Sequence, residues 1–222
     1  MSNGEWIEYT QHWEEADSGA SAWPMLAVAA SPTAELLYTG DSSGRVSVFT
    51  LNDPGQPLDR HASVLCAQAP VRRLMPMLDE RVFVQSDDAV LVLTDGGRQL
   101  FKRTTLPNEA FSAAAMAASG QQAFVCTSAG AGSLLDIAEG RVVKKSILEQ
   151  SVGAAYFGDV LVLGTASGEI VGRDPRTPAN MLWTTLAFGG PVTDIAGSQT
   201  CIYVCGNRAD PTQPYHMEPD ET

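Results

Sequence analysis

The chain has 222 residues, of which 44% are hydrophobic, and it carries 14 basic against 26 acidic side chains, for a formal net charge of −12. This charge disfavours autonomous binding of RNA or DNA, which gains its affinity from clustered lysine and arginine. No stretch approaches eighteen uninterrupted apolar residues, so no membrane-spanning segment is predicted. The length accommodates one all-β domain, and the 20 glycines and 13 prolines favour short strands separated by turns.

The chain opens with a leader, residues 1–23, that contains the aromatic-rich run EWIEYTQHW. The leader has neither the basic start nor the apolar core of a secretory signal peptide. We expect it to act as a latch, supplying one outer strand to the last of the repeat units that follow.

Residues 24–208 contain five copies of one cassette: a short apolar strand, a Gly, Asp or Ser turn, and a second strand that often closes on an acidic residue. The copies are LLYTGDSSGRVSVFTL from Leu36, RVFVQSDDAVLVLTDGG from Arg81, QAFVCTSAGAGSLLDIAEG from Gln122, VLVLGTASGEIVGRDPRT from Val160 and the shorter TCIYVCGNRAD from Thr200. The equivalent positions are taken to be Gly40, Gln85, Thr127, Gly164 and Gly206. With this alignment the cassette returns every 37 to 45 residues, which is the period of a propeller blade.

A further apolar segment precedes each cassette and has the length and position of a blade's innermost strand. These segments are PMLAVAASP from Pro24, PVRRLMPML from Pro70, AFSAAAMAA from Ala110, SVGAAYFG from Ser151 and GPVTDIAG from Gly190. More polar segments follow the first four cassettes, as expected of outermost strands that are wet on one side. The alanine-rich segment 110–118 is also compatible with a helix, but its place in the repeat favours a strand.

These elements predict an all-β, WD-repeat-like β-propeller with about four complete blades and a partial fifth. The final residues, 209–222, are acidic and interrupted by prolines, so we expect a flexible tail. Three interpretations of the partial blade stay open. The chain is a fragment of a longer propeller such as a seven-bladed one, or it closes an unusually small ring, or it completes itself on another molecule.

Candidate catalytic and metal-binding residues are few. The histidines are His12, His61 and His216, which leaves little from which to build a Ser/His/Asp or Cys/His arrangement. Cys201 and Cys205 lack a second pair of ligands for zinc and are interpreted as packed core thiols. We therefore predict no enzyme activity, no cofactor and no metal. The cysteines fall within strand patterns rather than at disulfide spacings, which indicates reduced thiols in the cytosol or nucleus, and we predict a cytoplasmic location.

The remaining polar motifs have structural interpretations. Asp87 and Asp88 lie in a predicted hairpin turn, where short acidic side chains cap backbone amides. Four glycines at strand ends and turns indicate backbone geometry rather than a phosphate cradle; they are Gly40, Gly44, Gly164 and Gly168. Three basic pairs are interpreted as solvated strand residues; they are Arg72–Arg73, Lys102–Arg103 and Lys144–Lys145.

The order of the cassettes and their residue patterns resemble those of the N-terminal WD-repeat propeller of the catalytic subunit of the poly(A)-nuclease deadenylation complex. The resemblance covers residues 24–208, from AVAASPTAELLYTGDSSGRVSVFTL through APVRRLMPMLDERVFVQSDDAVLVLTDGGRQLF to VLVLGTASGEIVGRDPRT and GPVTDIAG. Each motif is general among WD-repeat proteins, and the specificity lies in the shared order of five. The chain departs from the family after its fifth cassette, where PTQPYHMEPDET replaces the expected continuation of the blade.

The resemblance implies a non-catalytic docking module that scaffolds a protein partner, the pseudokinase adaptor subunit, and the messenger ribonucleoprotein during poly(A) tail shortening. The family's exonuclease domain is not among these residues. Two alternatives stay open, a general WD-repeat interaction scaffold and a small lectin-like propeller that binds ligands between blades. A hydrolase propeller would need channel-facing acids on three inner strands, and only Asp194 lies on one. The residue we expect to contact a protein partner is Trp183, on an outer strand.

Overall fold

The computed structural model describes residues 14–15, 23–51, 59–94, 97–106, 108–148, 151–197 and 201–207, and within these ranges it contains strands and no helix. The first sheet holds β1 (Glu14–Glu15), β2 (Met25–Ala30), β3 (Leu36–Asp41), β4 (Arg45–Thr50) and β5 (Asp59–Leu65). The second holds β6 (Val71–Pro76), β7 (Val82–Ser86), β8 (Ala89–Leu93) and β9 (Gln99–Thr104). The third holds β10 (Phe111–Met116), β11 (Gln122–Thr127), β12 (Ala131–Asp136) and β13 (Arg141–Ile147). The fourth holds β14 (Ser151–Phe157), β15 (Val160–Thr165), β16 (Glu169–Arg173) and β17 (Met181–Leu186), and the fifth holds β18 (Val192–Gly197) and β19 (Ile202–Gly206).

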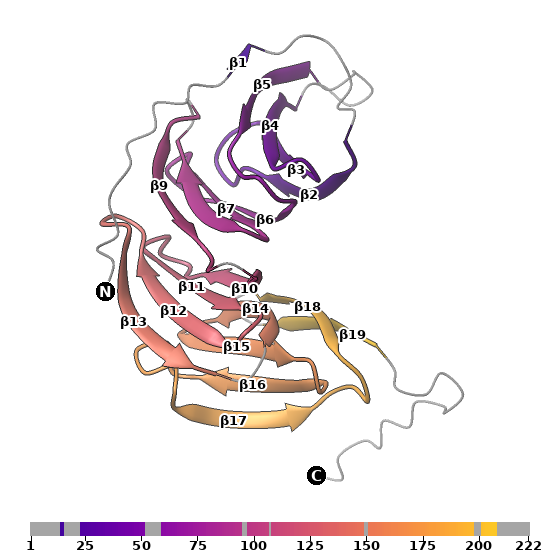
Figure 1. Cartoon of the computed structure of the whole chain (residues 1–222), viewed down its shortest axis with the longest axis vertical. Coiled ribbons are helices and arrows are strands. Elements are labelled where there is room, and N and C mark those ends of the chain that lie inside the picture. Colours follow the sequence, from indigo (N-terminus) through magenta and orange to yellow (C-terminus); the bar gives the residue numbers. More distant parts are fainter. Residues whose placement is uncertain are drawn as a thin grey trace.

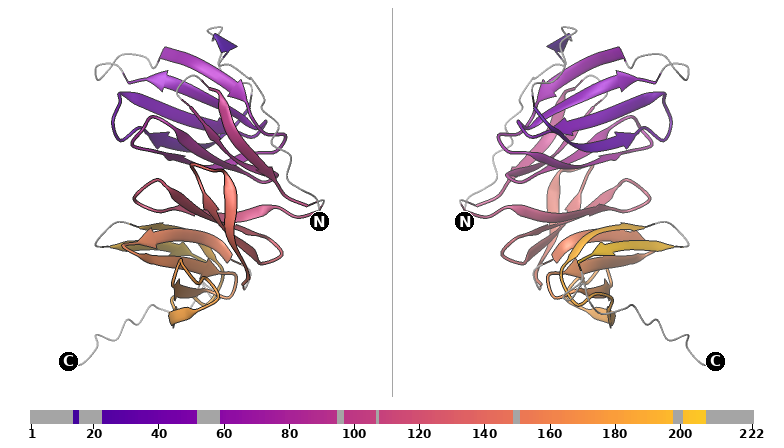
Figure 2. Two further views of the ribbon diagram at one scale, coloured as in Figure 1. Left: turned by 90° about the vertical axis from the view of Figure 1, so that its left-hand side faces the viewer. Right: turned by 90° about the vertical axis from the view of Figure 1, so that its right-hand side faces the viewer.

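Apart from β1, which lies beside β5, the strands of each sheet form an antiparallel meander in which consecutive strands are neighbours, as the predicted blades require. The five sheets follow one another along an open arc, with the first strand of each blade on the inner side (Figure 1). The side views show the same succession, with β1 at the outer end of the first sheet (Figure 2). The all-β propeller prediction is confirmed, and the alanine-rich segment 110–118 forms strand β10 rather than a helix.

The leader was expected to complete the last blade, and the part of it that the structure describes lies elsewhere. Glu14 and Glu15 pair with Ser63 and Ala62 of β5, so β1 adds a fifth, outermost strand to the first blade. Among the outermost strands of the blades, β5 is the nearest to the leader in sequence, which shortens the loop that must be closed. Residues 1–13 and 16–22 of the leader and the whole tail 209–222 lie outside the described residues.

The hydrophobic core is divided into four clusters, one between each pair of neighbouring blades. Tyr38 and Val46 of the first blade pack against Val71 of the second, and Phe83 of the second packs against Phe111 of the third. The other two clusters join the third blade to the fourth and the fourth to the fifth. Alternate residues of a central strand therefore serve two different cores, which explains why β7 and β8 are buried along their whole length.

Each inner strand carries a β-bulge after its first residue. The bulged residues are Leu26, Arg72, Ser112, Val152 and Thr193. A bulge inserts one unpaired residue and re-aims the side chains that follow it. The residues directly after the bulge, which are structurally equivalent, are Ala27, Arg73, Ala113, Gly153 and Asp194.

The hairpin turns between the second and third strands share one capping arrangement. A side-chain oxygen at the end of the second strand accepts a hydrogen bond from a backbone N–H at the start of the third, as Asp41 does from Arg45 and Thr165 from Glu169. Ser86 and Thr127 play the same part in the second and third blades. Gly44 and Gly168 lie in these turns with a φ of 89°, a left-handed conformation that a glycine adopts without strain, so these two glycines serve backbone geometry as predicted.

The bulges also correct the alignment of the cassettes. The residues that pair with the post-bulge positions are Gly40, Gln85, Cys126, Gly164 and Cys205. The predicted equivalents Thr127 and Gly206 are each one residue too late. Thr127 is the capping residue of its turn, and Gly206 resembles Gly40 and Gly164 by residue type alone.

Candidate functional site

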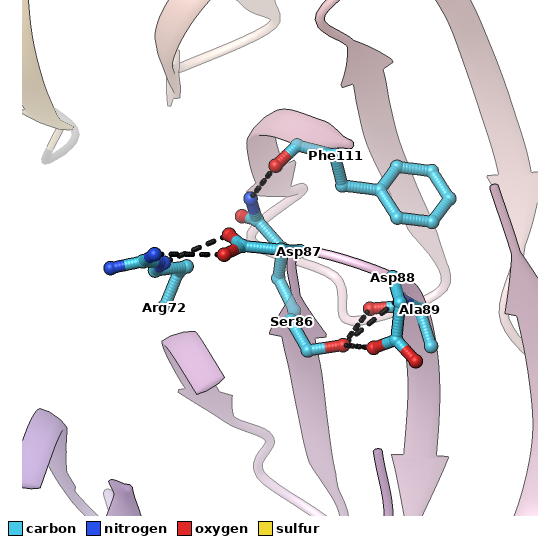
Figure 3. Close-up of polar contacts among 7 residues, drawn as sticks. Arg72, Ser86, Asp87, Asp88, Ala89 and Phe111 are labelled. Carbon is cyan, nitrogen blue, oxygen red and sulfur yellow. Dashed lines mark hydrogen bonds and ion pairs between the residues drawn. The ribbon is translucent and has the colours of Figure 1, made fainter. Parts of the chain in front are cut away.

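One contact recurs at every junction between blades. The residue of the second strand that faces the bulge touches the first inner-strand residue of the next blade. A Cβ on Gly40 would overlap Val71, and a Cβ on Gly164 would overlap Val192, so these two glycines permit the close approach of the neighbouring blade. Gln85 makes the same contact differently, by donating from Nε2 to the carbonyl oxygen of Phe111 at 3.1 Å (Figure 3).

Cys126 completes this series at the junction of the third and fourth blades. Burial raises the pKa of its thiol, and hydrogen bonds with Ser151, the first inner-strand residue of the fourth blade, oppose that rise. The four junctions thus use four residue pairs at one structural position. Small residues face Val71 and Val192, whereas Gln85 bonds to the backbone beside the larger Phe111.

The fifth blade offers the same position with nothing placed against it in the described part of the chain. Cys205 of β19 is equivalent to the fully buried Cys126, yet it is exposed. Tyr203, on the same strand, is 65% exposed. In each complete blade the second strand pairs on both sides, while β19 pairs only with β18 among the described residues. Among the residues that the structure describes, the blade therefore has one unpaired strand edge and one face without a neighbouring blade.

The first blade is open at the opposite end of the arc. Met25 is equivalent to Val71, Phe111, Ser151 and Val192, which are all buried, but it is 64% exposed. Val28, whose equivalents Leu74, Ala114, Ala154 and Ile195 are also buried, is 68% exposed. At each of the four junctions, the residues equivalent to Met25 and Cys205 contact each other across two neighbouring blades. Met25 and Cys205 themselves are exposed at the two ends of the arc.

The inner strands meet around Arg73. Its Nη1 donates to the carbonyl oxygens of Ala114 at 2.8 Å and Ala154 at 2.9 Å, and its Nη2 forms an ion pair with Asp194. One side chain of the second blade therefore bonds to the third, fourth and fifth blades. The positions equivalent to Arg73 in the third and fourth blades hold small residues, Ala113 and Gly153, which leave space for the guanidinium to cross the centre.

Asp194 was the one acidic residue found on a predicted inner strand, and the structure shows it neutralised by Arg73. The three acids that a channel hydrolase would need are not assembled there. Within the described residues no group of three or more His, Cys, Asp and Glu side chains could hold a metal ion. His12 and His216 lie outside the described residues, as does the side chain of His61.

A second ion pair lies at the rim, beside the capped turn of the second blade. Arg72 donates from Nε and Nη2 to the two carboxylate oxygens of Asp87, both at 2.8 Å (Figure 3). Asp88 accepts from Ser86 Oγ at 2.7 Å and from the backbone N–H of Gln68 at 3.2 Å. The capping role predicted for this acidic pair therefore holds for Asp88, while Asp87 serves the exposed arginine.

The other predicted residues are placed as follows. Trp183 lies on the outer strand β17, 38% exposed, with its indole over Gly172 of the paired strand. Cys201 and Cys205 are exposed rather than packed in the core, and no further blade lies against them in the described part of the chain. The basic pairs are not uniformly solvated, since Arg72 and Arg73 are bonded as described and Lys102 Nζ donates to the carbonyl oxygen of Cys66 at 2.9 Å. These long-range partners have no signal in the local sequence.

Comparison with protein-family models identifies one described as outer membrane protein assembly factor BamB, which matches residues 52–199, more than half of the chain. Comparison with curated protein sequences found no match. No helix in the described residues is long and apolar enough to cross a membrane.

Solved structures share the fold over most of the chain. The WD40 domain of Neurospora crassa Pan2 has a TM-score of 0.73 at 19% identity, covering 97% of this chain and 69% of that one. Saccharomyces cerevisiae Sqt1 has a TM-score of 0.69 at 14% identity, covering 81% and 55%. A chain of the mitotic checkpoint complex has a TM-score of 0.66 at 15% identity, covering 80% and 55%. The matched part of this chain thus spans about half of the length of the latter two. At these identities the likeness shows the propeller fold.

Proposed function

The chain belongs to the β-propeller family whose model is described as outer membrane protein assembly factor BamB, and on this fold we propose a non-catalytic, protein-docking function. The observation that carries the proposal is the unfilled junction contact at Cys205. An open strand edge beside an uncovered apolar face is a ready template for pairing with another polypeptide. The similar solved structures are also WD40-like propellers, and one of them is a chain of a multiprotein complex.

We propose the docking surface to be the free edge of β19 together with Tyr203 and Cys205. In the complete blades the third strand that occupies this place is largely buried; it is apolar throughout in β8 and apolar at its centre in β16. A bound partner segment would therefore be extended, with apolar side chains at alternate positions. Pairing along the edge supplies backbone hydrogen bonds, and burial of the apolar face supplies affinity.

The finer proposal is a role in shortening messenger RNA poly(A) tails, in the cytoplasm, with the pseudokinase adaptor subunit of the deadenylation complex as partner. Its support is the ordered set of cassettes described above and the similarity to the Pan2 WD40 domain. The chain has 14 basic against 26 acidic side chains, so the partner we propose is a protein rather than the RNA itself.

Titration of the purified chain with the purified adaptor, followed by calorimetry, tests this function. We expect Tyr203→Asp to weaken binding about tenfold or more, because it places a charge on the surface to be buried, and Tyr203→Phe to bind normally. Reaction of Cys205 with a thiol reagent should slow when the adaptor is bound. Normal binding by Tyr203→Asp would exclude the edge as the docking surface, and no binding by the native chain would exclude the adaptor.

We also propose that Trp183 contacts a protein partner, because large aromatic side chains dominate interface hot spots. The matched control is Leu186, which lies on the same strand and is 70% exposed. In the same titration Trp183→Ala should lose affinity at least about tenfold and Leu186→Ala should lose little. Equal affinities of the two variants would show that the indole only covers Gly172.

A further inference from the structure

The outer strands of the second and third blades each carry a basic pair, and strand register fixes where the members of each pair point. Arg103 of β9 lies directly opposite Val90, two positions along the strand from Phe101, which lies opposite Val92. Val90, Val92 and Phe101 all belong to the core between the second and third blades. Because residues opposite one another share a face of the sheet, Arg103 points towards the third blade.

The same reasoning places Lys145 on the facing side of the third blade. Lys145 of β13 lies opposite Ser133, which is two positions from Leu135 on β12. Leu135 belongs to the same core as Phe101. Side chains two apart in a strand share a face, so Lys145 points towards the second blade. Lys144 points the other way, and its Nζ donates to the carbonyl oxygen of Arg176 at 3.3 Å.

Two cations thus face one another across the outer part of one junction, and neither has a hydrogen-bond or ion-pair partner among the described residues. Several other basic side chains form ion pairs, as Arg72 does with Asp87 and Arg81 with Asp79. Arg103 is partly buried, and that burial lowers the pKa of its guanidinium. A partly buried guanidinium without a partner is costly, so a carboxylate bound beside Arg103, within reach of the exposed Lys145, would relieve this cost.

An apolar side chain lies beside these charges. Ile147 is opposite Ala131 in the register of β13, which puts it on the same face as Lys145, and it is 92% exposed. Leu106, just beyond the end of β9, is 68% exposed. The surface formed by Arg103, Lys145 and Ile147, the outer junction surface, therefore joins two positive charges to an uncovered apolar residue.

We propose that the outer junction surface binds a short, extended, acidic polypeptide segment in which carboxylates and a large apolar side chain stand at every second residue and so share one face. This extends the docking function proposed above to a second surface, distinct from the edge of β19. A polypeptide fits better than a nucleic acid because phosphate backbones gain affinity from many cations together, and this surface offers two on a chain with a net charge of −12. Carboxylates in an extended peptide lie at the spacing of alternate residues and need no longer basic track.

Fluorescence anisotropy with a labelled peptide of repeating Glu-Gly-Glu-Gly-Leu-Gly, which puts the carboxylates and the leucine on one face of an extended chain, tests the proposal on the full chain. Arg103→Gln combined with Lys145→Gln should weaken peptide binding at least about tenfold. The matched control is Arg98→Gln with Lys144→Gln, which removes the same charge from neighbouring positions and should leave binding within about twofold. Arg103→Lys with native Lys145 keeps both charges and should retain most of the affinity.

Thermal unfolding of each variant separates loss of binding from loss of the fold. Equal binding by the double variant and the native chain, or equal loss in the control pair, would overturn the proposal. A poly(A) 12-mer that binds more tightly than the peptide and depends on Arg103 and Lys145 would replace it with a nucleic-acid site. Tyr203→Asp should leave peptide binding unchanged, so failure here and failure of docking at β19 are separate results.

Discussion

The third and fifth blades place a cysteine at the same structural position, and the two thiols have opposite environments. Cys126 faces Ser151 of the next blade and is fully buried, whereas Cys205 has no next blade among the described residues and is exposed. The local strand patterns do not account for this difference, because both residues lie on second strands that face a bulge. A neighbouring blade, rather than the strand itself, decides what is core in this fold.

The largest effect of this difference should be on thiol reactivity. In the native chain at pH 8 we expect Cys205 to react with a thiol-modifying reagent at least about a thousandfold faster than Cys126, since a fully buried thiol reacts only through opening of the structure. Peptide mapping by mass spectrometry after timed quenching measures both rates. Comparable rates would show that the junction of the third and fourth blades opens freely.

The pH dependence of stability tests a further buried thiol, Cys66, by chemical denaturation at a series of alkaline pH values. Burial raises the pKa of Cys66 from 9.0 to about 12. The native thiol stays protonated between these values, while the thiol of the unfolded chain ionises near 9.0, so the unfolded state is favoured as pH rises. The free energy of unfolding should therefore fall between pH 9 and pH 12. Burial also raises the pKa of Tyr156, which adds to the fall in the same direction.

The next largest effect should separate the central arginine from its neighbour at the rim. Arg73→Met removes a charged donor from two carbonyl oxygens and one carboxylate and should lower the free energy of unfolding by roughly 2–3 kcal/mol. Arg72→Met removes an ion pair in which the arginine side chain is half exposed and should cost at most about 1 kcal/mol. Urea denaturation of both variants gives the two values. Equal losses would mean that Arg73 does not hold the inner strands together.

The smallest effect compares a filled junction with an unfilled one. Gly164→Ala places a methyl group against Val192 and should destabilise the chain by about 1–3 kcal/mol through overpacking. Cys205→Val enlarges the equivalent residue where the fifth blade is uncovered, and should change stability by no more than about 0.5 kcal/mol. Equilibrium unfolding again provides the measurement, and a large cost at Cys205 would reveal a covered site.

The sequence predicts what is local in this fold. Alternating apolar residues, turn residues and a repeat near forty residues are enough for blades and strands, including the inner strand β10 against its helical propensity. The alignment failed by one residue at Thr127 and Gly206, because capping residues and glycines at strand ends resemble each other in a single sequence. Burial of Cys205 was predicted wrongly, because strand periodicity does not show whether another blade lies against a strand.

The candidate surfaces depend on contacts between blades, and those are not encoded in any one cassette. Arg73 appeared as half of a solvated basic pair, yet its partner Asp194 is 121 positions away. The facing of Arg103 and Lys145 follows from the register of two sheets and their common core, which needs the order of strands as well as their existence. Polar partners of this kind are set by the angle between blades.

The reach of Arg73 has a consequence for the order in which the chain folds. Its three partners lie 41, 81 and 121 positions along the chain, so its bonds require three later blades to be in place. Contacts that close such long loops form late, after the entropy of closure has been overcome. Loss of the guanidinium should then accelerate unfolding while leaving the folding rate nearly unchanged. We therefore expect Arg73 to slow the unfolding of the native chain and to have little influence on its folding rate.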